Sequence, residues 1–341
     1  MQVKKRLQLF LGIFISLVFS YLALRKIAVS DLIDALRGIR AIYLLPSLIV
    51  IFAGHWLRSI RWRYLLKPVK HISTGSLFSA LMVGYLGNTV LPAHIGELFR
   101  AYLVGRNARV PKSAVLATIF VERIVDVYSL LILMFITVFI YPLPEWVAGT
   151  AIIVLALTSL MTVLLIVLKM KTNLFVTWLH ALPARISSTI QRLLRSFLYG
   201  FTRLESGSDY VYVGILSIAV WLTYWAVLHI NFHTFQFSYL SAVSSLVLLV
   251  TTTVAVLIPS SPGYVGTYHY LCQTTLALFG VPLSESLAYA IVVHGLNVFS
   301  LFLVGLIFAW KEGVTLMSMS ATKNDHLSDR NSNHVNQEEL N

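Results

Sequence analysis

Long apolar runs separated by short polar segments dominate the pattern along the chain. A helix needs about 20 mostly apolar residues to cross a bilayer. The pattern therefore predicts an all-α polytopic membrane protein with about six transmembrane helices. The predicted spans are Leu7–Leu24, Ala41–Leu57, Ala114–Tyr141, Trp146–Leu168, the first part of the uncharged stretch Tyr210–Ser284, and Ser286–Trp310. Arg25 and Lys26 follow the first run without a small-residue cleavage pattern, which indicates a retained signal anchor.

Composition strengthens this interpretation and excludes other classes. Of the 341 residues, 57% are hydrophobic and 12% are charged, whereas a soluble domain has about 25% charged residues. A soluble core of this size could not bury so much apolar surface, and a disordered chain would not contain it. The formal net charge of +12 lies in clusters between the apolar runs, which favours an anionic membrane surface over nucleic acid as the partner. Cys272 is the single cysteine, so an intrachain disulfide is excluded and a cysteine-based metal site is not expected.

Basic clusters predict the orientation, because cytoplasmic loops are enriched in Lys and Arg. We place three clusters and both termini on the cytoplasmic side. The clusters are Arg58, Arg61, Arg63, Lys67 and Lys70; Arg106, Arg109 and Lys112; and Lys169, Lys171, Arg185, Arg192, Arg195 and Arg203. Residues 142–145, 231–239 and 281–285 contain no Lys or Arg and are placed outside. The loop Arg25–Arg40 does not follow this rule, since the orientation places it outside although it carries four basic and two acidic residues.

This orientation makes two segments begin and end on one face: 77–104 on the inside and 240–279 on the outside. Each has helix-breaking residues at its middle: Pro92 and Gly96 in the first, and Pro259, Pro262, Gly263 and Gly266 in the second. Proline removes a helical hydrogen bond, and irregular backbone at membrane depth is tolerated only inside protein or beside a wet cavity. We therefore predict two re-entrant helical hairpins from opposite faces. The alternative is two ordinary spans with kinks.

An internal repeat supports pairing of the two hairpins. Val110–Leu131 aligns without gaps with Val281–Phe302, and nine of the 22 positions are identical, including the opening Val-Pro. In the predicted orientation the two spans run in opposite senses, which makes an inverted repeat with halves at 77–141 and 240–310. The single membrane domain then covers 1–312. It includes an amphipathic surface helix at about 182–204 and precedes a polar, disordered tail at 313–341.

The first half carries charged residues inside its predicted membrane segments, where contact with lipid is unfavourable. A charge at the bilayer centre costs at least about 2.5–3.5 kcal/mol, so these side chains should face the interior and pair. We expect Glu97 to pair with Arg123, and Arg100 with Asp126 or Glu122. The network either only pins the hairpin to the next span, or its arginines hold a phosphate while a carboxylate titrates. The candidate residues are Asn88, His94, Glu97, Arg100, Glu122, Arg123 and Asp126.

The second half carries neutral polar residues at the corresponding places. A helix starting near Thr267 would present free amides and a positive dipole end to an anion. His269 and His294 could form a proton relay, or could simply be packed. His294 and Asn297 correspond to Arg123 and Asp126 in the repeat. His229 and His233 have metal-ligand spacing but lie at a predicted helix end, and we expect no metal and no cofactor.

These motifs together resemble the flippase-like, lysylphosphatidylglycerol synthase transmembrane-region family over about residues 5–312. The residues are Asn88, Leu91-Pro92, Gly96-Glu97, Arg100, Glu122-Arg123, Asp126, Pro259, Pro262-Gly263 and Gly266-Thr267. His94 and His269 depart from the family, which usually has Arg and Glu there. In two-domain members similar to the bacterial multiple peptide resistance factor, a soluble domain transfers an amino acid from tRNA to phosphatidylglycerol, and the membrane domain is implicated in moving the product. About 30 polar residues follow Lys311, so the resemblance implies lipid handling without the synthase activity.

The sequence thus predicts a lipid-binding transporter or flippase-like protein of the bacterial cytoplasmic membrane, not an enzyme. An anionic phospholipid or polyprenyl-phosphate headgroup would lie between the two hairpins. An alternative is an accessory protein that scaffolds a lipid-modifying or envelope-glycan enzyme without moving lipid. A third hypothesis, an intramembrane lipid enzyme, lacks a recognisable nucleophile or metal cluster. No phosphate-binding P-loop occurs, nucleic acid is not expected as a partner, and the oligomeric state is left open.

Overall fold

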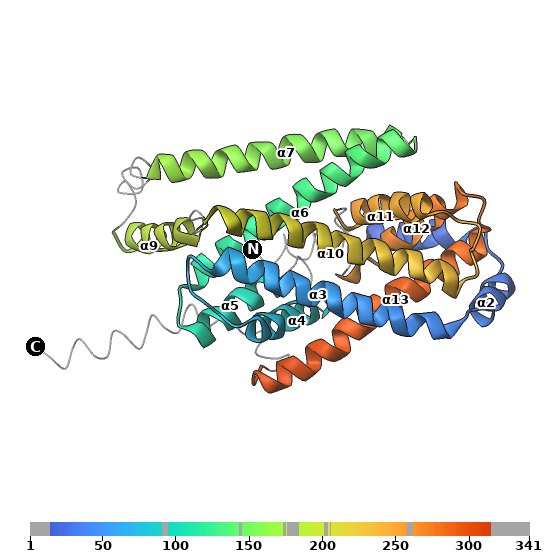
Figure 1. Cartoon of the computed structure of the whole chain (residues 1–341), viewed down its shortest axis with the longest axis horizontal. Helices are drawn as coiled ribbons and strands as arrows, with labels where there is room; N and C mark the ends of the chain where they lie inside the picture. Colours follow the sequence, from blue (N-terminus) through green and yellow to red (C-terminus); the bar gives the residue numbers. More distant parts are fainter. Residues whose placement is uncertain are drawn as a thin grey trace, which may run out of the picture.

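The computed structural model describes residues 14–90, 95–142, 145–172, 175, 184–200, 204, 206–257 and 262–314. Within these residues it contains helices and no strand (Figure 1). Five helical segments are long and apolar enough to cross a membrane. They are η1 with α3 (Ala41–Tyr43 and Leu44–Leu66), α6 (Lys112–Ile140), α7 (Glu145–Met170), α10 (Gly207–Thr234) and α13 (Leu283–Lys311). The all-helical class is confirmed. The expected first span, 7–24, is described only as the helix Phe14–Leu24.

The second span differs from its prediction in where it ends. The apolar run stops at Leu57, yet α3 continues as regular helix to Leu66. Arg58 and Arg61, which we assigned to a cytoplasmic loop, lie inside this helix and are buried. Their charges are tolerated because carboxylates from a distant helix neutralise them, which the positive-inside rule cannot register.

Four shorter helices form two pairs. α4 (Thr74–Val90) packs against α5 (Gly96–Ala108), and α11 (Ala242–Leu257) packs against α12 (Thr267–Ala277). In Figure 1 the first pair lies at the end of the molecule that carries α9, and the second pair lies towards the end that carries α2. The 3-10 turn η2 (Pro262–Tyr264) precedes α12 and contacts α4, so the second pair reaches the first.

The predicted breaks coincide with the ends of these short helices where the structure describes them. Gly96 opens α5, and Pro262 opens η2. Gly263 and Gly266 have φ angles of 73° and 90°, a region that favours glycine. Pro92 and Pro259 lie outside the described residues.

Glycine also permits the close crossing of α4 and α5. A Cβ atom on Gly96 would overlap the carbonyl oxygen of Gly84 and crowd Asn88, and one on Gly87 would meet the Gly96 Cα. The Asn88 Oδ1 accepts a hydrogen bond of 2.8 Å from the Gly96 amide. This bond satisfies a free amide at the start of α5 and ties the two helices together.

The apolar interior consists of two main clusters, one around each short pair. The first is built on α4 and α5 and includes Trp62 of α3, Ile119 of α6 and Val213 of α10. The second is built on α11, α12 and the first half of α13, and includes Ile51 of α3 and Leu130 of α6. Four long helices, α3, α6, α10 and α13, therefore contribute to both clusters. The ionised side chains of α3 and α6 lie between the members that these helices contribute to the two clusters.

Peripheral helices complete the molecule. The helix Phe14–Leu24 packs on α12, where the Gln273 Nε2 donates to the Ala23 carbonyl at 3.1 Å. α2 (Val29–Arg37) contacts α13. α9 (Ala184–Gly200) forms within the range predicted for the amphipathic helix and packs on α6, where Gly200 touches Ala114. Its position on a membrane surface stays a prediction.

Candidate functional site

A cluster of ionised side chains lies between the two apolar clusters. Glu122 and Asp126 are near the middle of α6, between Ile119 and Leu130, which belong to different apolar clusters. Arg58 and Arg61 lie between Ile51 and Trp62 of α3 in the same way. The two carboxylates are thus at mid-length of α6, and the two arginines lie in the second half of α3. We call the set Arg58, Arg61, Glu97, Arg100, Glu122, Arg123 and Asp126 the charge cluster.

Two arginines of α3 bind both carboxylates of α6. The Arg58 Nε donates to the Glu122 Oε1 at 2.6 Å, and its Nη2 donates to the Asp126 Oδ2 at 2.7 Å. The Arg61 Nη2 donates to the other Asp126 oxygen at 2.6 Å. Glu122 and Asp126 are four residues apart and share one face of α6. Arg58 and Arg61 are three residues apart and share one face of α3. These four residues form a network of ion pairs that joins α3 to α6.

α10 supplies neutral partners for the same two arginines. The Arg58 Nη1 donates to the Tyr224 hydroxyl at 3.1 Å, and the Arg61 Nη1 donates to the Ser217 hydroxyl at 3.1 Å. These side chains lie on either side of the middle of α10. Three membrane-length helices are therefore joined at one level by hydrogen bonds to ionised groups, which are the stronger kind.

Arg100 connects α5 to this network of ion pairs. Its Nη2 donates to the Glu122 Oε2 at 2.8 Å, and its guanidinium stacks on the Trp62 ring at 4.1 Å from the centroid. Its methylene groups pack against Gly84, where any Cβ atom would overlap them. Glu122 is 0% exposed and is within ion-pair distance of three arginines. The predicted pairing of Arg100 with Glu122 is present.

Arg123 and Glu97 form the second predicted pair, and they differ from the rest in exposure. The Arg123 Nε donates to the Glu97 Oε1 at 2.6 Å, and Nη2 contacts the same oxygen. The Arg123 side chain is 38% exposed and that of Glu97 is 21% exposed, whereas Arg58, Arg61 and Arg100 are at most 7% exposed. This pair is the accessible edge of the charge cluster.

The charge cluster carries an excess of positive charge, with four arginines against three carboxylates. Taking ions out of water costs several kcal/mol each, and mutual attraction offsets this only with good geometry and further hydrogen bonds. Most donors here are matched, but the buried Nε atoms of Arg61 and Arg100 have no hydrogen-bond partner among the described residues. Such a set favours one additional anion at its accessible edge.

The polar residues of the second half are neutral and pack mainly against rings. His269 and His294 have ring centroids 5.0 Å apart, and His294 stacks on Tyr268 at 4.6 Å. The His269 Nδ1 accepts from the Gly266 amide at 3.3 Å, which satisfies the start of α12. α12 begins at Thr267 as expected, and the Thr267 hydroxyl donates to the Tyr264 carbonyl at 3.1 Å.

Asn297 does not reproduce the role of its repeat counterpart. Asp126 is bound by two arginines, whereas Asn297 is exposed on α13 and its carbonyl accepts from Ser300 within its own helix. His94, also a candidate, lies outside the described residues. Among the described residues, no group of three or more metal-ligating side chains is present.

Sequence analysis missed Arg58, Arg61, Ser217 and Tyr224. One signal for the arginines was available. The run Ala41–Leu57 is 17 residues long, shorter than the roughly 20 needed to span, and extending it would have carried both arginines into the membrane. Ser217 and Tyr224 had no such signal, because a hydroxyl in an apolar helix carries no information about its partner.

Residues 9–305 match the protein family described as "Lysylphosphatidylglycerol synthase TM region". The chain belongs to this family. The match covers all the helices that carry the charge cluster and both short pairs. Membership and the apolar helices together indicate an integral membrane protein linked to lipid handling. No curated protein and no solved structure matches the chain.

Proposed function

We propose that this protein binds a phosphate-bearing anionic lipid and carries its headgroup through the membrane, without enzymatic change to the lipid. The observation that carries the proposal is the half-exposed Arg123 at the edge of a buried cluster with one excess positive charge. An anionic phospholipid or a polyprenyl phosphate would supply the matching charge.

Exposure divides the charge cluster into two roles. Arg58, Arg61, Arg100, Glu122 and Asp126 form a rigid frame, because each is bonded to residues of other helices. All but Asp126 are buried, and Asp126 is held by two arginines. Arg123 has Glu97 as its short-range carboxylate partner, and both are accessible. A lipid phosphate would displace Glu97 from Arg123 and receive two parallel N–H bonds from the planar guanidinium. Glu97 would then act as the competitor that releases the headgroup.

The proposed path lies between two re-entrant hairpins. An α-helix rises about 1.5 Å per residue, so α5 with 13 residues is about 20 Å long and α12 with 11 residues about 17 Å. Both are shorter than the roughly 30 Å of the hydrocarbon core. Each pair also has its outer ends at one end of the molecule (Figure 1). Re-entry from opposite faces explains both features, and kinked full spans explain neither.

We further propose that the two halves form an inverted repeat, with the basic end in the bacterial cytoplasm. α6 and α13, which carry the repeated sequence, run in opposite senses in Figure 1. The end with the 67–73 loop, Arg106 and α9 is rich in Lys and Arg, while 235–241 and 279–284 at the other end contain none. α2 and its flanking arginines remain the exception to this orientation.

One observation favours the alternative of a scaffold that moves no lipid. Every carboxylate of the charge cluster already has an arginine partner, so the network could simply fix the helices for a partner enzyme. The two proposals differ in whether purified protein moves lipid on its own.

Reconstitution into liposomes tests the proposal. The measurement is the rate at which a fluorescent phosphatidylglycerol becomes accessible to an external quencher. We expect wild-type protein to exceed protein-free liposomes, Arg123→Gln to lose most of this rate, and Glu97→Gln to bind the lipid more tightly because the competitor is gone. Binding of the same lipid to the two purified variants completes the test, because opposite changes in affinity cannot come from simple destabilisation.

Arg37→Gln is the matched control, since Arg37 is 78% exposed on α2 and pairs weakly with Asp34 in the same helix. It should leave the rate unchanged. A wild-type rate equal to that of empty liposomes would refute transport and favour the scaffold. Equal rates for wild type and Arg123→Gln would remove the role assigned to Arg123.

A further inference from the structure

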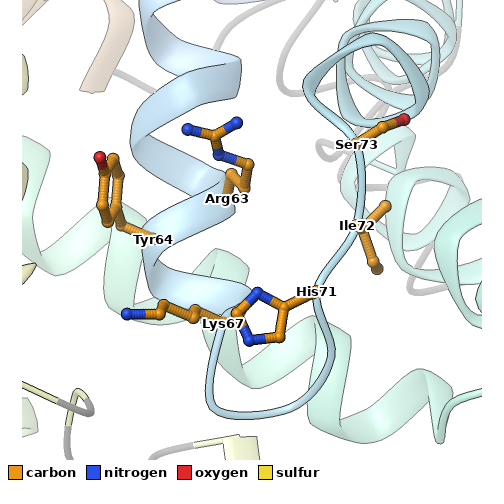
Figure 2. A pocket seen from close by; sticks show the side chains of 6 residues that line it. All are labelled: Arg63, Tyr64, Lys67, His71, Ile72 and Ser73. Carbon is orange, nitrogen blue, oxygen red and sulfur yellow. The ribbon is translucent and has the colours of Figure 1, made fainter.

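Two adjoining hollows lie at the end of the molecule where α3 ends and α4 begins. The first, of about 360 Å³, is lined by Arg63, Tyr64, Lys67, His71, Ile72 and Ser73 (Figure 2). The second, of about 260 Å³, shares His71, Ile72 and Ser73 with the first and extends between α4 and α5 to Asn107 and Ala108. The two hollows adjoin at these shared residues, and we call them together the groove; it reaches the end of α5. The larger volume is at the lower limit of small-ligand pockets.

The described lining of the groove is basic. It includes Arg63, Lys67 and Lys70 and no carboxylate. Lys67 contacts Asp209 at 3.1 Å, and the Lys70 Nζ donates to the Ala108 carbonyl at 2.7 Å. Arg63 is exposed, and among the described residues no carboxylate lies within ion-pair distance of it. Figure 2 shows Arg63 across from Ile72 and Ser73, with the His71 ring below.

The groove is distinct from the charge cluster. Arg63 follows Arg61 by two positions, which places it about 200° around α3, on a different side of the helix. It is also about 7.5 Å further along the axis than Arg58. The groove adds apolar walls to its cations, with Ile72, Ala80 and Val104 beside Ser73, Ser76 and Asn107. That combination suits a molecule with a phosphate at one end and an apolar part beside it.

We propose that this groove is a second anion site, which holds the phosphate of a membrane lipid at the surface, with Arg63 as its main ligand. The planar guanidinium can donate two parallel hydrogen bonds to phosphate oxygens. The site does not depend on lipid movement, and would hold a headgroup at the open end of the α4–α5 pair even in a protein that transports nothing.

Binding of dioctanoyl phosphatidic acid to detergent-purified protein, measured by calorimetry, tests the site. An Arg123→Gln background removes any contribution from the charge cluster and separates this proposal from that of transport. Adding Arg63→Gln should weaken binding at least about tenfold, because a phosphate loses its charged hydrogen-bond donor. Adding Arg192→Gln, an exposed arginine of α9 outside the groove, should change binding less than about twofold.

A second variant guards against a folding defect in Arg63→Gln. The Ser73 hydroxyl accepts from the Ser76 amide at the start of α4, and aspartate serves equally well in that capping position. Ser73→Asp should keep the helix, add a negative charge to the lining of the groove, and weaken binding by repelling the phosphate. Retained binding in both variants would overturn the proposal.

Two further ligands identify the source of the phosphate. Glycerol 3-phosphate has no acyl chains, and dioctanoylglycerol has no phosphate. Weak binding of both supports a lipid site. Binding of glycerol 3-phosphate as tight as that of phosphatidic acid would overturn the lipid assignment in favour of a soluble phosphoester, and equal binding of dioctanoylglycerol would overturn the phosphate assignment.

Discussion

The two short helix pairs have similar outlines and opposite chemistry. The α4–α5 pair meets α6 through Arg100 and Glu97, which bind ionised partners on that span. The α11–α12 pair meets α13 through Tyr268, His269 and His294, which pack as neutral rings. The first pair is thus held to its neighbouring span by charge, and the second pair by packing. This difference predicts that replacing a polar residue lowers the free energy of unfolding far more in the first half than in the second.

Glu122→Gln should have the largest effect. The substitution keeps the volume but removes the carboxylate that Arg58, Arg61 and Arg100 share. Breaking a buried ion pair by removing one partner costs about 3–5 kcal/mol, because the other charges stay buried and uncompensated. The free energy of unfolding in detergent micelles measures the loss.

Asp34→Asn is the control for Glu122→Gln, because Asp34 pairs with Arg37 on the exposed surface of α2. Exposed pairs contribute little, so this variant should unfold like wild type. A Glu122→Gln protein as stable as the control would mean that the buried network does not hold α3, α5 and α6 together.

Gly96→Ala should have an intermediate effect. The new methyl group would overlap the backbone of Gly84 and force α4 and α5 apart. Overpacking of this kind costs about 1–3 kcal/mol, and the shift would also lengthen the Arg100–Glu122 contact. The same unfolding measurement applies.

The matched control is Gly75→Ala at the start of α4, where a Cβ atom meets nothing within 4 Å. Alanine is the better helix former, so this variant should be as stable as wild type or slightly more stable. If both alanine variants lose the same stability, helix propensity rather than close approach explains the effect, and the crossing has no special role.

His294→Gln should have the smallest effect of the three. It removes the stacking of His294 on Tyr268 and its contact with His269 but leaves no buried charge unpaired. Loss of an aromatic pair costs about 0.5–1.5 kcal/mol. A loss as large as that of Glu122→Gln would show that the second half depends on a polar network as strongly as the first, and would erase the contrast between the halves.

The sequence determined the helical membrane class, the approximate spans and most of the breaks. Apolar length is a local property, and so is the effect of Pro or Gly on a helix. The sequence also indicated that Glu97 pairs with Arg123, and that Arg100 pairs with Asp126 or Glu122, of which the structure shows Glu122. Charges at membrane depth must find partners, and few candidates were available.

Tertiary structure decided the rest of the charge cluster. In the sequence alone, Arg58 and Arg61 look like part of a cytoplasmic loop. Only the structure shows that Glu122 and Asp126, more than 60 residues later in the chain, lie against them. The same contact explains how α3 carries two buried arginines, since charges inside a membrane protein face the interior and pair there. Periodicity and composition record what each segment prefers alone. The oppositely charged partner that stabilises a buried ion in the low-dielectric interior is determined only when the helices pack.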